Sequence, residues 1–245
     1  MEIFLSKIDQ ERFGYVIAKS KLCDTDKVEE LLSQARTLGV ELLIVRLATD
    51  NLKAAQELER NNAILTDTLI YYQKKNVSKY NIKLPEGYSA CYADEGDAEH
   101  VGGVAAGSFK GYFGHYHSDN RLERIDCDNV YTSWAKNSCL DRKIADEVIL
   151  IKKNNEIAAF STLKIIEKNC FDGVLFGVSP AHTGQGLHLN LMQLSQNWGA
   201  ENNISRMVTS TQINNVKVQK NWCRVGLEPL NSFYTFHVWL NHDSI

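Results

Sequence analysis

The segment from Asp172 to Leu191 constrains this chain most, because it changes from a strand pattern to a helix pattern across two closely spaced glycines. An apolar run ends at Pro180, which cannot continue a strand, and Gly184 and Gly186 follow. Glycines here let the backbone turn tightly and present bare N–H groups beside the positive end of the next helix dipole. The segment therefore predicts a cradle for a phosphate-type anion at the start of a helix.

The helix that follows the glycines is amphipathic. Its apolar residues recur with the i, i+4, i+7, i+11 spacing of one helical face, and they are Leu187, Leu191, Leu194 and Trp198. We expect Leu187, Leu191 and Trp198 to be core residues without a side-chain function. Their stripe would pack the helix on a sheet and aim its N-terminus at the ligand.

Strand and helix patterns alternate along the chain, which predicts a mixed α/β (α+β) fold with a central mixed sheet flanked by helices. The first part contains the predicted strand 13–18, helix 26–38, strand 41–47, helix 52–60 and strand 64–72. The second part contains a predicted hairpin turning at Asn154-Asn155, then strand 174–179, helix 186–200, strand 206–210, helix 214–225 and strand 233–240. Polar residues 73–80 and the Pro85–Gly87 turn separate the parts, which predicts domains at 1–80 and 85–245.

Charge and cysteine usage exclude several classes of function. A net charge of −3 gives no broad basic surface for nucleic acid or an anionic membrane, so neither is an expected partner. No apolar run reaches the roughly 18 residues of a membrane span. The six cysteines contain no C-x-x-C pair, and no Cys/His spacing fits a zinc site. We therefore expect reduced thiols, no metal and a cytoplasmic location.

The order of strand, glycine loop, helix, strand and further helix resembles the GNAT superfamily of N-acetyltransferases over residues 88–240. That family's acyl-CoA signature is R/Q-x-x-G-x-G/A, and Gly184 and Gly186 occupy its two small-residue positions. Ala181 stands where the family has Arg or Gln, and neighbouring His182 could partly replace the missing cation. The resemblance implies a GNAT fold with acyl-CoA (coenzyme A carrying an acyl group) as co-substrate.

A second landmark of the family is an Asn followed by an aromatic residue and then by x-x-x-Gly-Phe. Asn215, Trp222 and Gly226-Leu227 resemble this landmark, with Trp222 where the family usually has Tyr. That Tyr commonly protonates the departing thiolate, and an indole cannot act as this acid. The substitutes available for the role are Tyr234, His237 and Cys223, of which Tyr234 is a catalytic candidate.

The resemblance also implies how acyl-CoA would bind. Backbone amides of the glycine loop and the helix start would hold the pyrophosphate, and they belong to Thr183, Gly184, Gly186, Leu187 and His188. Main-chain groups of Phe176 and Val178 would pair with the pantetheine arm as if it were a strand. Asn215 completes the predicted cofactor-binding residues.

The first part of the chain resembles a degenerate half of the same fold, because residues 54–72 mimic the helix, turn and final strand of a GNAT without a glycine loop. A half-GNAT domain before a complete one resembles the dTDP-fucosamine acetyltransferase group of nucleotide-amino-sugar N-acyltransferases, as does segment 113–122. Residues suited to stack a base or sugar and to grip a diphosphate are Tyr112, Phe113, Tyr116, Arg121, Tyr131 and Trp134.

These resemblances imply a reaction. An acyl group, acetyl or a short hydroxyacyl such as 3-hydroxybutyryl, would pass from acyl-CoA to the 3- or 4-amino group of a dTDP-linked amino-dideoxyhexose by direct attack on the thioester. Such sugars belong to lipopolysaccharide or capsule biosynthesis. His115 and His117 are the candidate general bases, because histidine titrates near neutral pH. A homodimer is also expected, because strand 233–240 could pair across an edge.

Two other functions stay open. The enzyme could acylate another amine, such as a peptide N-terminus or a polyamine, although a polyamine site should be rich in carboxylates and segment 109–134 is dominated by aromatic residues. The lack of Tyr at position 222 also suits a non-catalytic acyl-CoA-binding module. A purely structural role is an equal alternative for His115, His117, Tyr131 and Trp134.

Overall fold

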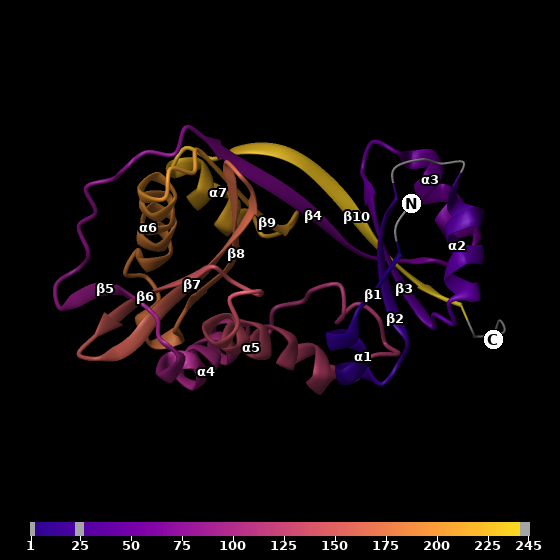
Figure 1. Ribbon diagram of the computed structural model, residues 1–245, viewed down its shortest axis with the longest axis horizontal. Coiled ribbons are helices and arrows are strands. Elements are labelled where there is room, and N and C mark those ends of the chain that lie inside the picture. The colour runs from indigo at the N-terminus through magenta and orange to yellow at the C-terminus, as the bar shows by residue number, and fades with distance from the viewer. Residues whose placement is uncertain (1–2, 23–26, 241–245) are drawn as a thin grey trace. The chain divides into compact units, whose positions relative to one another are not determined.

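The computed structural model describes residues 3–22 and 27–240, and the chain divides into two compact units. The first unit comprises Met1–Ile70, Phe113–Cys127 and Asn231–Ile245, and the second comprises Tyr71–Tyr112 and Asp128–Leu230. Two long strands, β4 (Ile64–Lys75) and β10 (Glu228–Trp239), each begin in one unit and end in the other (Figure 1).

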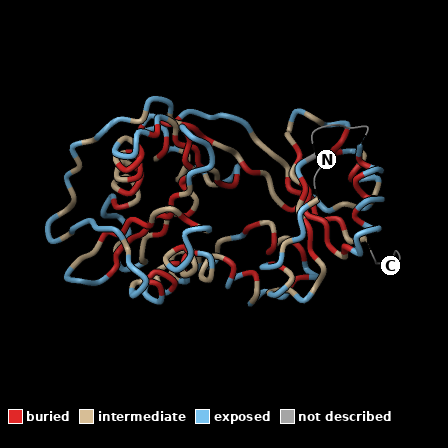
Figure 2. Tube along the Cα trace, viewed as in Figure 1, coloured by how far each residue is buried: buried red, intermediate tan, exposed pale blue. Residues whose placement is uncertain are grey.

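The first unit is a mixed sheet with helices on one face. Its strand order is β1 (Ile3–Leu5), β2 (Ile17–Leu22), β3 (Leu42–Ala48), β10 and β4. β2 and β3 are parallel, whereas β1–β2 and β3–β10 are antiparallel. The helices α2 (Val28–Thr37) and α3 (Leu52–Arg60) bury their apolar residues against alternate residues of β3 and β10 (Figures 1 and 2). A short helix, α1 (Lys7–Phe13), precedes β2.

The second unit is built on the strand order β4, β9 (Arg206–Gln212), β8 (Cys170–Val178), β7 (Glu156–Glu167), β6 (Glu147–Lys153) and β5 (Tyr88–Tyr92). Helices α4 (Ala98–Ser108) and α5 (Arg124–Leu140) cover one face through a core that includes Phe160 and Leu175. Helix α6 (Leu187–Glu201) packs on the other face, where Trp198 meets Phe171. Helix α7 (Val216–Arg224) follows β9, and short 3₁₀ turns span Glu95–Asp97 and Pro180–His182.

The mixed α/β fold with a central mixed sheet flanked by helices is confirmed. Helix 52–60 matches α3, and the hairpin turns at Asn154 and Asn155, whose φ angles of 48° and 70° are those of a tight strand-to-strand turn. The stripe on α6 is buried at Leu187, Leu191 and Trp198 as expected.

The strand predicted at 13–18 is wrong in its first half. Residues up to Phe13 belong to α1, and Gly14 ends this helix with φ of 74°, donating its N–H to Gln10. β2 therefore begins only at Ile17. The predicted start of helix 26–38 at Asp26, and Cys23, lie outside the described residues, and α2 is seen from Val28.

The split into domains at 1–80 and 85–245 stays a prediction, as does the half-GNAT nature of the first. The two compact units have other boundaries than these predicted domains, because residues 113–127 and 231–245 belong to the first unit. The cysteines that the structure describes, from Cys91 to Cys223, are free thiols. Among the described helices, none combines the length and apolar content needed to cross a bilayer.

Two helical glycines provide a matched test of the packing in the second unit. A methyl group at Gly199 of α6 would overlap the Phe171 ring, whereas a methyl group at Gly103 of α4 would meet open space. We expect Gly199→Ala to lower the free energy of unfolding by about 1–3 kcal/mol through overpacking. Gly103→Ala should raise it by roughly 0.5–1 kcal/mol, because alanine favours helix. Urea unfolding of both variants measures the difference, and equal effects would contradict the packing of α6 on β8.

Candidate active site

β8 loses one of its strand neighbours halfway along its length. It pairs in parallel with β9 only from Cys170–Arg206 to Asp172–Val208, although it continues to Val178. At the point of divergence, the hydroxyl of Thr209 donates to the carbonyl oxygen of Gly173 at 2.8 Å. Pairing with β7 continues to Val178. The edge of β8 beyond Gly173 therefore offers main-chain groups to an extended ligand.

Phe176 and Val178 direct their main-chain groups to this edge. Ser179 donates its N–H to Ala158 of β7 at 2.8 Å, and since main-chain direction alternates along a strand, the N–H groups of Phe176 and Val178 point away from β7. The N–H of Val178 donates to Oγ of Ser108 at 3.1 Å. A ligand that pairs with Val178 would therefore have to replace the Ser108 hydroxyl.

The glycine loop adopts the conformation that its sequence predicts. Gly184 and Gly186 have φ of 82° and 76°, in the left-handed region, and Gly186 stands at the N-cap of α6. Within the described chain, the amides from Gly184 to His188 have no protein acceptor, and the first helical bonds are those from Leu189 and Asn190 to Gly186. The amide of Thr183 makes a long bond of 3.5 Å to Pro180. These amides at a helix N-terminus form a site suited to a phosphate-type anion.

Two histidines flank this loop. Nδ1 of His182 lies 2.9 Å from the Tyr88 hydroxyl, which ties the loop to β5. The ring of His188 on α6 meets the Phe176 ring edge-on, with centroids 5.6 Å apart. Nε2 of each histidine is buried without a hydrogen-bond partner in the described residues. Burial, with a smaller contribution from Lys217, lowers the pKa of His188 to about 4, so its ring is neutral near pH 7.

The second landmark contributes structural contacts. Asn215 stands at the N-cap of α7 and donates its side-chain N–H to the Thr211 hydroxyl at 3.0 Å. Trp222 is buried, and its ring meets Tyr72 edge-on with centroids 5.4 Å apart. Its indole N–H has no acceptor among the described residues. Trp222 thus packs as a core residue that keeps one unused donor.

The first unit contains a hydrogen-bonded relay of Asp119, His237 and His115, of which Asp119 and His237 are buried. Nδ1 of His237 lies 2.8 Å from Oδ2 of Asp119, which also accepts from the Trp239 indole at 2.8 Å. Nε2 of His237 lies 2.9 Å from Nδ1 of His115. Although burial alone would raise the pKa of Asp119, the bonds from His237 and Trp239 lower it, so the carboxylate is ionised.

With both rings neutral, the relay fixes the tautomer of each. Ionised Asp119 requires Nδ1 of His237 to donate, so Nε2 of His237 accepts from Nδ1 of His115. Nε2 of His115 then carries a lone pair. Burial, then the proximity of His237, Arg46 and Lys19, holds the pKa of His115 well below 6.5. A neutral histidine with one free lone pair is the form that a general base needs.

The other two catalytic candidates have different surroundings. His117 is buried, and its Nδ1 accepts the N–H of Gly114 at 3.1 Å, so it stabilises its own turn. Tyr234 packs with α2 and α3, on the same face of β10 as Phe236. His237 points from the opposite face of this strand, so Tyr234 is not brought to the relay.

The predicted acceptor residues belong to both compact units. In the second unit, Tyr131 stacks on Phe109 at 4.7 Å and meets Tyr112 edge-on at 5.1 Å, while Trp134 is exposed on α5. In the first unit, three predicted residues make separate contacts: Tyr116 donates to Asp9, Phe113 meets Arg124, and Arg121 lies over Trp239.

Several polar residues of these sites could not be identified from the sequence. No sequence motif contains Asp119, Trp239 or Ser108, and Asp119 contacts His237 although 118 positions separate them in sequence. The one available signal for Asp119 was its place in the His-rich segment. No group of three or more His, Cys, Asp or Glu side chains in the described ranges is arranged to hold a metal ion.

The match to a known protein family covers the part of the chain that contains β8 and the glycine loop. Residues 109–226 match the profile of the Acetyltransferase (GNAT) family. The spore coat polysaccharide biosynthesis protein SpsD of Bacillus subtilis (strain 168) is 23% identical over 202 residues, which cover 81% of this chain and 67% of that protein.

Solved structures share the fold at low sequence identity. A GCN5-related N-acetyltransferase from Sphaerobacter thermophilus has 12% identity and a TM-score of 0.65, covering 94% of this chain and 75% of its own. A tandem GNAT protein from the clavulanic acid biosynthesis pathway, solved without AcCoA, has 12% identity and a TM-score of 0.64, covering 94% and 77%.

The neutral state of His188 makes stability depend on pH. The unfolded chain protonates this ring near pH 6.5 and the folded chain only near pH 4, so stability is lost as pH falls between these values. Between pH 7 and pH 5, we expect wild type to lose about 2 kcal/mol more unfolding free energy than His188→Gln does. Urea unfolding at both pH values measures this.

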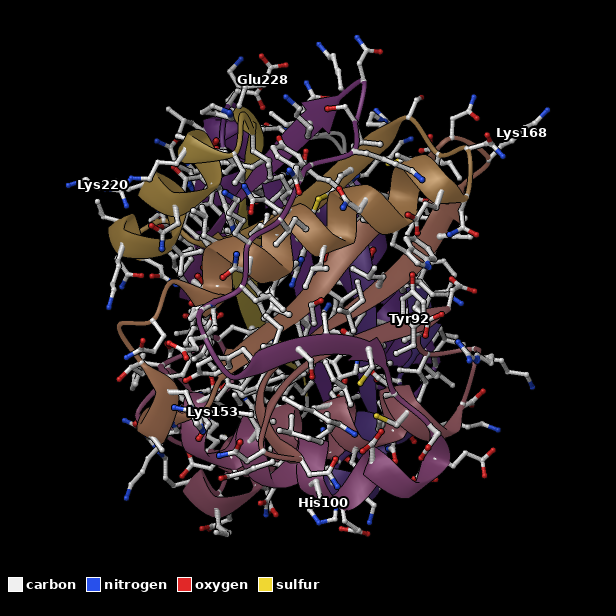
Figure 3. All side chains as sticks on the ribbon, turned by 90° about the vertical axis from the view of Figure 1, so that its left-hand side faces the viewer. Tyr92, His100, Lys153, Lys168, Lys220 and Glu228 are labelled. Carbon is white, nitrogen blue, oxygen red and sulfur yellow. The ribbon has the colours of Figure 1, made fainter. Side chains whose placement is uncertain are left out.

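The control for this test is His100→Gln, since His100 is exposed on α4 (Figure 3). This control should keep the pH slope of the wild type. Equal slopes for His188→Gln and wild type would contradict a neutral, buried His188.

Proposed function

This chain carries a GNAT acetyltransferase domain, and from that premise we propose that it transfers an acyl group from acyl-CoA to the amine of a nucleotide-linked amino sugar. The GNAT fold agrees with the order of motifs, and the family match supports an acyltransferase. The observation that carries the proposed donor site is the open edge of β8 leading into the unpaired amides of Gly184 to His188.

The donor would lie along β8 and end at the start of α6. The pyrophosphate accepts from the free amides at the helix N-terminus, where the helix dipole favours an anion. The pantetheine arm pairs with main-chain groups of Phe176 and Val178, displacing the Ser108 hydroxyl. Ala181, which replaces the family's Arg or Gln, should weaken donor binding little in this arrangement, because the groups that donate hydrogen bonds to the donor belong to the backbone.

Two observations support an amino sugar as acceptor. SpsD, the relative with 23% identity, is described as a spore coat polysaccharide biosynthesis protein. The Phe113 ring is 56% exposed beside Arg124, a combination that suits a base or sugar carrying phosphate. A dTDP-linked amino-dideoxyhexose with a 3- or 4-amino group is the acceptor that we propose, with acetyl or a short hydroxyacyl as the group transferred.

The chemistry requires one proton transfer from the amine. The amine nitrogen attacks the thioester carbonyl carbon, the C–S bond breaks, and coenzyme A leaves as thiolate. We assign the amine's proton to Nε2 of His115, whose lone pair the relay leaves available. The thiolate, with a solution pKa of about 8.5, can leave without a dedicated acid, which Trp222 could not supply. A homodimer and a cytoplasmic location complete the proposal.

A direct assay tests the proposed reaction. Purified protein is mixed with acetyl-CoA or 3-hydroxybutyryl-CoA and dTDP-linked 3- or 4-amino sugars, and the products are weighed by mass spectrometry. We expect one amino sugar to gain one acyl mass while free coenzyme A accumulates. Acylation of a peptide or polyamine instead would show that the acceptor is a different amine. Binding of coenzyme A without turnover on any amine would favour a non-catalytic module.

Removal of the proposed base should affect turnover and not donor binding. We expect His115→Gln to lower kcat by about 10²–10⁴-fold, while the KM for acyl-CoA stays at its wild-type value. In the wild type, kcat should hold as pH falls to 6.5, because the pKa of His115 lies well below that value. His100→Gln serves as the control. An unchanged kcat in His115→Gln would show that His115 is not the general base of the reaction.

A further inference from the structure

One ring nitrogen of His188 is buried without a hydrogen bond. His188 is the second residue of α6, and its Nε2 has no partner among the described residues. Every residue of the second unit, Tyr71–Tyr112 and Asp128–Leu230, lies within the described chain, so this unit supplies no partner. A polar atom that is buried and left unpaired costs stability. Native structures contain few such atoms, and one that persists is a candidate contact for a ligand.

The His188 ring lies close to the point where β9 leaves β8. It meets the Phe176 ring edge-on, with centroids 5.6 Å apart. The Phe176 ring in turn covers Gly173, since a methyl group on Gly173 would lie 2.8 Å from two carbons of that ring. Gly173 is the residue whose carbonyl oxygen accepts the Thr209 hydroxyl where the strands diverge. The main-chain N–H of His188 also belongs to the free amides of the helix start, so His188 lies at both parts of the proposed donor site.

The surroundings of this nitrogen favour an uncharged polar group. Burial and, to a smaller extent, the charge of Lys217 lower the pKa of His188 to about 4, so the ring is neutral near pH 7. A neutral imidazole donates from one nitrogen and accepts at the other, so Nε2 can pair with an amide in either direction. A phosphate is better served by the free amides from Gly184 to His188. The apolar Phe176 ring beside Nε2 also suits an uncharged chain.

We propose that Nε2 of His188 hydrogen-bonds an amide of the pantetheine arm, so that this side chain recognises the acyl donor. The inference rests on the proposed function, because it concerns the acyl-CoA of that reaction. The pantetheine arm contains secondary amides, each with one N–H donor and one carbonyl acceptor. The bond would satisfy an atom that the free protein leaves unpaired, so no protein hydrogen bond has to break for it to form.

Calorimetric titration of the full chain with coenzyme A, and separately with ADP, tests this contact. ADP shares the adenosine and the diphosphate of coenzyme A and lacks the pantetheine arm. We expect His188→Leu to weaken coenzyme A binding by roughly 3- to 10-fold, the range of one hydrogen bond between neutral groups. His188→Gln should stay within about twofold of wild type, because its side-chain amide can make the same kind of bond. The Kd for ADP should stay unchanged in both variants, and His100→Gln is the control.

Urea unfolding separates recognition from a structural role. At pH 7, we expect the unfolding midpoint of His188→Leu to be at or above that of the wild type, because apolar atoms replace an unpaired buried nitrogen. Weaker coenzyme A binding by a protein at least as stable as wild type would support recognition. A drop in stability together with equal losses of coenzyme A and ADP binding would overturn the inference. Wild-type coenzyme A binding by His188→Leu would overturn it as well.

A spectroscopic measurement needs no change at the proposed contact. In wild-type protein with ¹⁵N-labelled histidine, coenzyme A should shift the NMR resonance of the His188 Nε2, and ADP should leave it in place. The spectrum of His188→Gln, which lacks this resonance, assigns it. An equal shift with ADP would assign Nε2 to the nucleotide end of the donor and overturn the inference.

The acylation assay separates this inference from the proposed function. Binding of coenzyme A that depends on His188, without acyl transfer to any amine, would overturn the proposed reaction and leave the contact standing. Acyl transfer by His188→Leu with the wild-type KM for acyl-CoA and the wild-type Kd for coenzyme A would overturn the contact and leave the acyltransferase standing.

Discussion

The early end of β8–β9 pairing is the constraint on which the second unit's proposed site depends. Parallel pairing stops at Asp172–Val208, and the Thr209 hydroxyl takes the Gly173 carbonyl instead. A strand paired on both sides would have satisfied its main-chain groups internally and left nothing for a ligand. Pairing with β7 up to Val178 keeps β8 rigid while its other edge stays available. The rigid edge then leads directly into the glycine loop, so one element positions both parts of the proposed donor site.

In the first unit, the corresponding constraint is a buried carboxylate. Asp119 is 2% exposed, and its carboxylate accepts three hydrogen bonds, from His237, from the Trp239 indole and from the main-chain N–H of Arg121. An ionised group in this position is costly unless it is paired, and the pairing requires Nδ1 of His237 to carry a proton. With both rings neutral, the proton position on His115 is therefore set by a carboxylate that His115 does not touch.

Local features of the sequence predicted the second unit's elements well. The left-handed glycines, the apolar stripe of α6 and the Asn154-Asn155 turn each depend on neighbours in the sequence, so they can be read without tertiary structure. The N-terminal helix was missed because a glycine that ends a helix and a glycine that begins a strand look alike in sequence. Trp222, which the sequence places at the family's usual Tyr position, is buried against Tyr72. The predicted acceptor residues were chosen from an aromatic-rich segment, and they stay a prediction because they are divided between the two units.

The sequence by itself determined the family resemblance, the glycine loop and the histidines worth testing, because short-range spacing encodes backbone conformation and residue chemistry. Tertiary structure alone decided which histidine keeps a free lone pair, since Asp119 and His237 are 118 positions apart in sequence. It likewise decided that the His188 ring lies against Phe176 with Nε2 unpaired, because the packing of α6 on the sheet, which spacing does not encode, brings them together. Long-range register and burial set the protonation and charge of a site, whereas local sequence sets the shape of the backbone that holds it.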